Sequence, residues 1–350
     1  MKKTLIVKWI LVGIIGIMAL ESNAQLKILT GVAGEEYDLL GQDIMNNVEK
    51  DKVKLQNTGG GKANIGTMVA GEIAITQYDV LQKALMQDLT EASGKTDNIR
   101  ILLPLGRTEV HLIVRTNKRD FTSLKDLNSP DVKVSVGTKD HSSYVTAQAI
   151  KELTGSTWTD VELPLNESIQ ALLNNEIDAL LYVGSAPVPQ FAVFSKLPVS
   201  EQNTIKLIPI EHLKVRENYD AGRVMGGTYK WANYNVETIV AKTILVANVA
   251  KETKEQTDAY IAILRDIKKN ILLLQKDGKS AQWKQTNFIF TGMEWDVHKS
   301  AEDVFFPKAG SGEEKKDGDA KKDVKTGGEV KKDATTGGEV KKDTKKTGTK

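Results

Sequence analysis

The chain has 350 residues, with 48 lysines and arginines against 46 aspartates and glutamates, so its formal net charge is only +2. This balance excludes the strongly basic surface that nucleic-acid binding requires, and we expect no nucleic-acid partner. The chain has no cysteine, which excludes disulfides and thiolate metal sites. We expect neither a metal nor a cofactor.

The first residues have the pattern of a secretory signal peptide. Lys2, Lys3 and Lys8 precede an apolar run over residues 9–20. A run of about twelve apolar residues suits a signal-peptide core and is too short to span a bilayer. We therefore expect cleavage after Ala24 and export to the periplasm, where a chain without a lipid-modified cysteine is free. The alternative is that the segment is kept as a membrane anchor.

Short apolar strands alternate with helical patterns in the first part of the chain. The spacing of apolar residues predicts strands over residues 26–30, 52–56 and 72–76, and helices over 37–48 and 61–69. Alternation of this kind indicates a parallel sheet with helices on its faces.

The same alternation restarts after Ile101 and is followed by two long apolar segments near the end. The predicted elements are strands at 131–136, 176–182 and 205–210, helices at 142–153 and 169–173, and closing segments at 239–250 and 258–275. Two such repeats predict an α/β fold of the two-lobed periplasmic-binding-protein kind (type II, Venus-flytrap). The segments crossing between the lobes are expected near 105–114 and 207–227.

The ordered part is longer than one hydrophobic core usually allows, which supports two lobes. We expect a signal peptide at 1–24, the first part of lobe I at 25–110, lobe II at 111–215, a return to lobe I with C-terminal helices at 216–307, and a tail at 308–350.

The composition changes sharply in the tail. The string Thr-Gly-Gly-Glu-Val-Lys-Lys-Asp occurs at 326–333 and again at 336–343, and no aromatic residue follows Phe306. Such a segment buries too little apolar surface to offset the entropy of ordering it, so we expect a disordered Lys/Gly/Glu-rich repeat tail. It carries 13 lysines against 9 acidic residues; a solvated tail is favoured over one that binds cell-wall or lipid anions.

Three of the predicted strands end in small-residue turns that open a helix, at residues 30–37, 58–64 and 137–144. Ligands of doubly wound sheets bind at the carboxyl ends of strands. The free N–H groups and the positive dipole end of a helix start form an anion site. One such turn is ordinary, but three at equivalent places favour a binding site.

These motifs, in this order over about 27–303, resemble the TAXI family of solute receptors from tripartite ATP-independent periplasmic (TRAP-type) transporters. The matching segments are Thr30–Gly41, Thr58–Asn64, Gly71–Asp79, Ser123–Leu127, Asn175–Ala179 and Gly227–Tyr229. The resemblance implies a periplasmic receptor that captures a small carboxylate, a glutamate-like amino acid or a dicarboxylate, by closure of two lobes. It also implies an integral-membrane TRAP permease as partner.

The sequence departs from this family at the turns themselves. The family's Ser-Gly-Thr is replaced by His141-Ser142-Ser143, and its Tyr-Tyr-Pro by Tyr37-Asp38-Leu39. Glu35 and Glu36 stand where small residues are usual. The identity of the ligand is therefore less transferable than the fold.

The candidate ligand-binding residues come from these turns and from tyrosines that could close over a ligand. They are Gly31, Gly34, Glu36, Tyr37, Thr58, Gly60, Asn64, Gln77, Thr138, His141, Ser142, Ser143, Tyr182 and Tyr229. Glu35 and Glu36 could pair with a ligand ammonium, or simply favour the helix dipole. The serines could bind an anion or only cap their helix.

Sequence motifs of the common enzyme classes are missing. Gly59–Lys62 is followed by Ala63 rather than the Ser or Thr of a phosphate-binding loop. The four histidines form no His-Glu-x-x-His, and no Gly-x-Ser-x-Gly occurs. We expect no catalytic residues and no enzyme. The alternative to a transport receptor is a ligand-binding sensor or cell-envelope interaction module without a transport partner.

Overall fold

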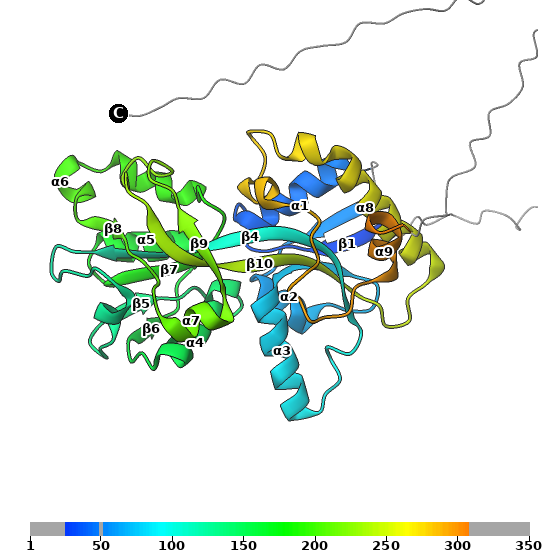
Figure 1. The fold of residues 1–350 in the computed structure, drawn as a ribbon, viewed down its shortest axis with the longest axis horizontal. Coiled ribbons are helices and arrows are strands. Elements are labelled where there is room, and N and C mark those ends of the chain that lie inside the picture. Colours follow the sequence, from blue (N-terminus) through cyan, green and yellow to red (C-terminus); the bar gives the residue numbers. More distant parts are fainter. Residues whose placement is uncertain (1–24, 49–51, 308–350) are drawn as a thin grey trace, which may run out of the picture. The chain divides into compact units, whose positions relative to one another are not determined.

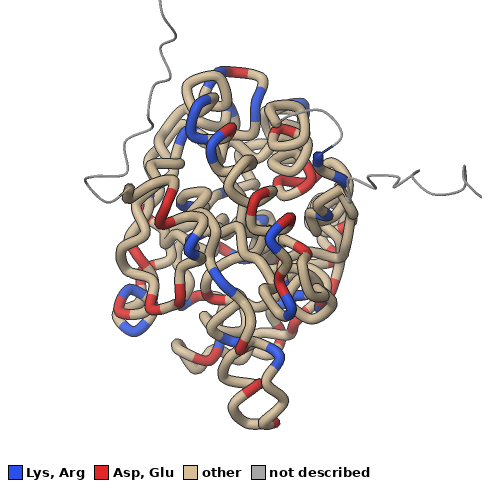
Figure 2. Tube along the Cα trace, turned by 90° about the vertical axis from the view of Figure 1, so that its right-hand side faces the viewer, with Lys and Arg blue, Asp and Glu red and all other residues tan. Residues whose placement is uncertain are grey.

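The computed structural model describes residues 25–48 and 52–307 (Figure 1). The predicted signal peptide at 1–24 and the predicted disordered tail at 308–350 lie outside the described residues. None of the helices described is both long enough and apolar enough to cross a membrane. Figure 2 shows acidic and basic residues interspersed along the described trace in that view.

Parallel strands make up the first half of the sheet. β1 (Leu26–Leu29) lies between β2 (Val53–Gln56) and β3 (Ile73–Gln77), in parallel with both, and β3 then pairs antiparallel with β10 (Val236–Asn248). All five residues of β3 are buried. A strand buried on both faces is typical of a sheet with helices on both sides.

Helices cover both faces of this half, which we call lobe I. α1 (Glu36–Asn47) and α8 (Lys254–Leu274) pack on one face, and α2 (Gly61–Thr67) and α3 (Tyr78–Glu91) on the other (Figure 1). α8 begins with a capping box in which Thr253 and Gln256 satisfy each other's backbone amides.

The second half of the sheet, which we call lobe II, has the same layering. β7 (Ala179–Val183) lies between β5 (Lys133–Ser135) and β4 (Ile99–Arg115). α4 (Ser142–Thr154) packs on one face, with a core that includes Ala147 and Ile150, and α5 (Leu165–Leu173) packs on the other. The remaining elements are η1 (Leu124–Leu127), β6 (Thr159–Val161), η2 (Pro189–Lys196), α6 (Val199–Gln202), β8 (Ile205–Leu207), α7 (Leu213–Asn218), β9 (Asp220–Val224), η3 (Ala281–Gln285) and α9 (Lys299–Phe305).

Two long antiparallel strands, β4 and β10, run through both lobes. β4 pairs with β10 from Ile99 to Glu109 and with β7 from Val110 to Val114. The first crossing between the lobes therefore lies in β4 near Glu109 and Val110, within the predicted range 105–114. β10 begins against β9 in lobe II and ends against β3 in lobe I. The chain therefore crosses back to lobe I within β10 and not near 207–227, as was predicted. Residues 207–227 stay in lobe II, because their last part forms β9 and pairs with the start of β10.

Every strand and helix predicted from the sequence has a counterpart in the structure, with ends that differ by a few residues. The predicted α/β fold of the two-lobed periplasmic-binding-protein kind is confirmed. The sequence did not predict β6, β9, α3, α6, α7, α9 or the short helices η1, η2 and η3, and β4 was predicted only as a crossing segment.

Candidate functional site

The starts of α2 and α4 meet between the two lobes. The amide of Ala63 in α2 donates to the carbonyl of Asp140, which precedes α4, at 3.2 Å. A Cβ added to Gly60 would lie 3.0 Å from the Cα of His141, and one added to Gly61 would overlap the hydroxyl of Ser142. Glycine at positions 60 and 61, where α2 begins, therefore allows the two backbones to approach this closely.

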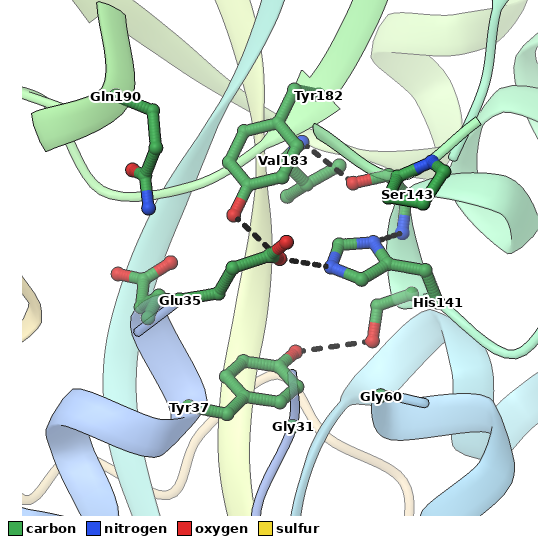
Figure 3. Close-up of polar contacts among 12 residues, drawn as sticks. Gly31, Glu35, Tyr37, Gly60, His141, Ser143, Tyr182, Val183 and Gln190 are labelled. Atoms are coloured by element: carbon green, nitrogen blue, oxygen red, sulfur yellow. Dashed lines mark hydrogen bonds and ion pairs between the residues drawn. The ribbon is translucent and has the colours of Figure 1, made fainter. Parts of the chain in front are cut away.

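Glu35, just before α1, reaches across this gap to lobe II (Figure 3). Its Oε2 lies 3.1 Å from Nε2 of His141 and accepts a hydrogen bond from the Tyr182 hydroxyl at 3.3 Å. Nδ1 of His141 accepts from the amide of Ser143 at 3.0 Å. Because Nδ1 is an acceptor, the ring proton is on Nε2, which donates to Glu35.

Further polar contacts join the lobes on either side of Glu35. The hydroxyls of Tyr37 and Ser142 lie 3.2 Å apart, and Nε2 of Gln190 donates to the carbonyl of Gly34 at 3.1 Å. The Thr146 hydroxyl donates to the carboxylate of Asp79 at 2.7 Å and lies 3.3 Å from Oε1 of Gln77. Each of these contacts joins a residue of lobe I to a residue of lobe II, so together they hold the two lobes in contact.

Two more carboxylates meet the turn that follows β7. The amide of Ser185 donates to both oxygens of Glu36 at 3.1 Å, and the amide of Ala186 donates to Oε2 of Glu109 at 3.0 Å. Burial raises the pKa of Glu36 to about 7, against hydrogen bonds from Ser185 that lower it. Burial also raises the pKa of Glu109. In the part of the chain that the structure describes, no lysine or arginine forms an ion pair with either.

Asn64 and Thr58, two of the predicted ligand-binding residues, serve as internal ties of lobe I. The buried amide group of Asn64 donates to the carbonyls of Thr30 at 2.5 Å and Ile75 at 2.7 Å, and its oxygen accepts from the Thr58 hydroxyl at 2.6 Å. The backbone amide of Gly34 likewise donates to the carboxylate of Asp38, at 2.8 Å. These groups shape the turns and do not point into the gap.

Three predicted residues of lobe II are also engaged within their own lobe. The buried Ser143 hydroxyl accepts from the amide of Val183 at 2.9 Å. The Tyr229 hydroxyl lies 2.8 Å from His111 and accepts from the amide of Val188 at 2.9 Å. The carbonyl of Thr138 accepts from the amide of His141 at 2.9 Å.

The structure brings the other predicted residues together around one small cavity. It has a volume of about 10 Å³, and among its lining residues are Gly31, Glu36, Tyr37, Gly60, Gln77, His141, Ser142 and Tyr182. This is roughly the room that a single water needs. A second cavity of about 270 Å³ adjoins it and shares Glu36 and Tyr182 with it.

The binding residues proposed from the sequence did not include Glu109, Ser185 or Gln190. Gly184-Ser185 could have been found, because it is a fourth small-residue turn at the end of a strand. Glu109 carried a weaker signal, a lone carboxylate among the buried residues of β4. Gln190 carried none.

Comparison with protein families decides the relationship. The profile of the NMT1-like family matches residues 28–301, most of the chain. The chain belongs to the NMT1-like family. Family and fold together identify a solute-binding protein of the NMT1-like type and not an enzyme. Among the residues described, no group of three or more His, Asp or Glu side chains is placed to hold a metal ion.

Several solved structures share features of this NMT1-like chain at low identity. A TctC solute binding protein from Polaromonas is 14% identical, with 70% of this chain and 84% of that chain covered and a TM-score of 0.42. MatC from Rhodopseudomonas palustris with bound malate is 12% identical (75% and 94% covered, TM-score 0.43). The GluR0 ligand binding core with L-glutamate is 13% identical, with 75% of this chain and 98% of that chain covered and a TM-score of 0.44. No curated protein matches the chain.

Proposed function

We propose that this NMT1-like protein is the periplasmic receptor of a TRAP-type transporter of the TAXI kind. It captures a small carboxylate, a glutamate-like amino acid or a dicarboxylate, by closing its lobes. The observation that carries the proposal is the convergence, at one interlobe gap, of the starts of α1, α2 and α4 with the amides after β7. Helix starts and backbone amides at the end of a strand are donors that suit an anion.

The contacts of Glu35 and Glu36 support a carboxylate as the ligand. These two side chains accept hydrogen bonds from His141, Tyr182 and the amide of Ser185. A protein carboxylate therefore fits the donors that lobe II presents. A ligand carboxylate that enters the gap would replace one of these side chains on the same donors.

The crossing strands supply a place for the lobes to move. The pairing of β4 with β10 shifts register between Thr243 and Ile244, opposite Gly106. Gly106 has a φ of +124°, a conformation that favours glycine. Irregular pairing of this kind bends a strand locally, and hinges consist of a few such residues. We place the hinge at Gly106 and Thr243.

Export and partner follow from the same proposal. A leader at 1–24 that is cleaved after Ala24 would release the receptor into the periplasm, and the closed form would dock on an integral-membrane permease. A sensor or cell-envelope module without a transport partner is the alternative. Genes for a large and a small permease beside this one favour transport, whereas a histidine-kinase gene favours the sensor.

A thermal-shift screen of the chain from residue 25 onward tests the proposal. The compounds are amino acids, dicarboxylates, keto acids and sulfonates. A ligand at about a hundred times its Kd stabilises the folded state by about 2.7 kcal/mol. For a protein of this size, that raises the Tm by roughly 5–10 °C. If no compound moves the Tm, the receptor proposal is contradicted.

A further inference from the structure

The larger cavity beside Glu36 lies between the lobes and was not anticipated by the sequence. Its walls come from α1 and Tyr182 of β7, from residues 184–190 that follow β7, and from residues 277–284 in the loop before η3 and in η3 itself. The last two segments contribute no residue to the predicted binding set. The cavity continues the interlobe gap, because Glu36 and Tyr182 line both spaces.

Volume and wall chemistry indicate what the cavity accommodates. At about 270 Å³ it lies just below the range of about 300–1,000 Å³ for drug-sized ligands, which suits a smaller solute. The neighbouring space of about 10 Å³ holds no more than a water. The apolar part of the wall is formed by Leu39, Tyr182, Pro187, Val188, Pro189 and Ala281. An apolar group is therefore favoured there.

The inner end of the cavity is anionic. Glu36 is partly buried and lines both spaces, and Ser185 is its one hydrogen-bond donor among the residues that the structure describes. The carboxylates of Glu35 and Glu109 are close enough to disfavour its charge. An ammonium group would relieve that repulsion, whereas a second ligand carboxylate would add to it.

Other titratable groups also face Glu36 or line the same cavity. They are Glu35 before α1, Tyr37 of α1, Glu109 of β4, Tyr182 of β7, Tyr229 before β10, Asp277 and Lys279 before η3, and Lys284 of η3. Lys279 pairs with Asp43 at 3.1 Å and Lys284 with Asp277 at 2.7 Å. Both lysines thus already have a carboxylate partner of their own.

We propose that Glu36 binds the ammonium group of an α-amino acid whose apolar side chain fills the cavity between Leu39 and Pro187–Pro189. The inference rests on the proposed receptor function and keeps the ligand a small carboxylate, but it selects an apolar amino acid instead of glutamate or a dicarboxylate. The α-carboxylate then lies beside the ammonium, on the donors that now hold Glu35. Binding of the ammonium shifts Glu36 toward its ionised form, so the complex releases a proton near neutral pH.

Isothermal titration calorimetry with matched probes tests this assignment. The probes are L-leucine, 4-methylpentanoate (which lacks the ammonium), 3-methylbutylamine (which lacks the carboxylate), L-glutamate and succinate. L-Leucine is expected to bind at least ten-fold more tightly than any other. Titration at pH 7 in buffers of different ionisation enthalpy is expected to show release of roughly half a proton per leucine, given a Glu36 pKa of about 7.

Two variants separate the ammonium site from the cavity. Glu36→Gln should lose leucine affinity at least ten-fold and release no proton, while Glu217→Gln, at an exposed position of α7, should match the parent in both. Ala281→Phe narrows the cavity and should move the preference from leucine to L-alanine. Thermal melts of each variant without ligand establish that it is folded.

The outcomes distinguish this inference from the receptor proposal. If succinate or glutamate binds and leucine does not, the receptor proposal stands and the inference is overturned. The same holds if 4-methylpentanoate binds as tightly as leucine, or if both Glu36→Gln and Ala281→Phe bind leucine as the parent does. If neither these probes nor the wider screen binds, both are overturned.

Discussion

The carboxylate of Glu35 and the imidazole of His141 lie 3.1 Å apart and join the two lobes directly. The ring of His141 also stacks on that of Tyr182, with centroids 5.6 Å apart, and the Tyr182 hydroxyl donates to the same carboxylate. One side chain of lobe I thus holds two rings of lobe II. This contact can both stabilise the closed arrangement and compete with a ligand carboxylate.

Replacing Glu35 with Gln tests that competition. The amide keeps the shape of the side chain but removes the charge, so the donors on His141 and Tyr182 become more available to a ligand. We expect carboxylate ligands to bind up to about ten-fold more tightly, equivalent to about 1.4 kcal/mol. Calorimetric titration measures this, with Glu217→Gln as control. Weaker binding by Glu35→Gln would mean that Glu35 contacts the ligand itself.

The contact between the Tyr37 and Ser142 hydroxyls is a second tie between the lobes. A double-mutant cycle with Tyr37→Phe and Ser142→Ala is expected to give a coupling of about 0.5–1.5 kcal/mol in the free energy of unfolding, typical of one buried hydrogen bond. Urea unfolding of the four proteins measures it. Strict additivity would show that the 3.2 Å approach of these hydroxyls contributes nothing.

Asn64 is expected to matter for stability. Its side chain satisfies the carbonyls of Thr30 and Ile75 and the hydroxyl of Thr58 inside lobe I. Asn64→Ala removes all of these hydrogen bonds from the interior of lobe I, so we expect the free energy of unfolding to fall by about 2–4 kcal/mol. Asn218→Ala, at an exposed position with one side-chain hydrogen bond, should cost less than about 0.5 kcal/mol. Equal effects in denaturant titrations would contradict the scaffold role.

Glu36 should make stability depend on pH in a defined direction. Its pKa rises from 4.5 to about 7 on folding, so between these values the folded state binds more protons than the unfolded state. The free energy of unfolding therefore falls as pH rises through this window, and the loss is complete above about pH 7. Glu36→Gln should gain on the order of 1–3 kcal/mol over the parent between pH 5 and pH 8.

Chemical denaturation of parent and Glu36→Gln across that range provides the comparison. Burial also raises the pKa values of Asp79 and Glu109, so the free energy of unfolding of both proteins still depends partly on pH. The difference between the two proteins isolates Glu36. A difference that stays constant from pH 5 to pH 8 would show that its pKa is ordinary.

The sequence predicted the turns well because small residues after an apolar strand constrain the backbone locally. It did not predict α3, since Tyr78 follows the last residue of β3 with no intervening turn to separate strand from helix. It could not separate Ser142, which contacts lobe I, from Ser143, which bonds to Val183. That distinction depends on which side of a helix start faces the other lobe, and only tertiary packing determines it.

The crossing in β10 was misplaced for a related reason. An apolar segment near the end of the chain is equally compatible with a strand inside one lobe and a strand shared by two. Only the pairing of β10 with β9 at one end and β3 at the other distinguishes them. The larger cavity could not be predicted from the sequence either, because its walls join segments about 90 residues apart, around Pro187 and Lys279.

Capture of a solute by lobe closure is the central claim, and a distance across the lobes tests it most directly. The chain has no cysteine, so Val199→Cys in α6 and Leu272→Cys in α8, at positions 72% and 75% exposed, can be spin-labelled selectively. Double electron–electron resonance should show a broad distribution without ligand and one shorter, narrower distance with a saturating ligand from the thermal-shift screen. An unchanged distribution, at concentrations where calorimetry shows full occupancy, would contradict closure.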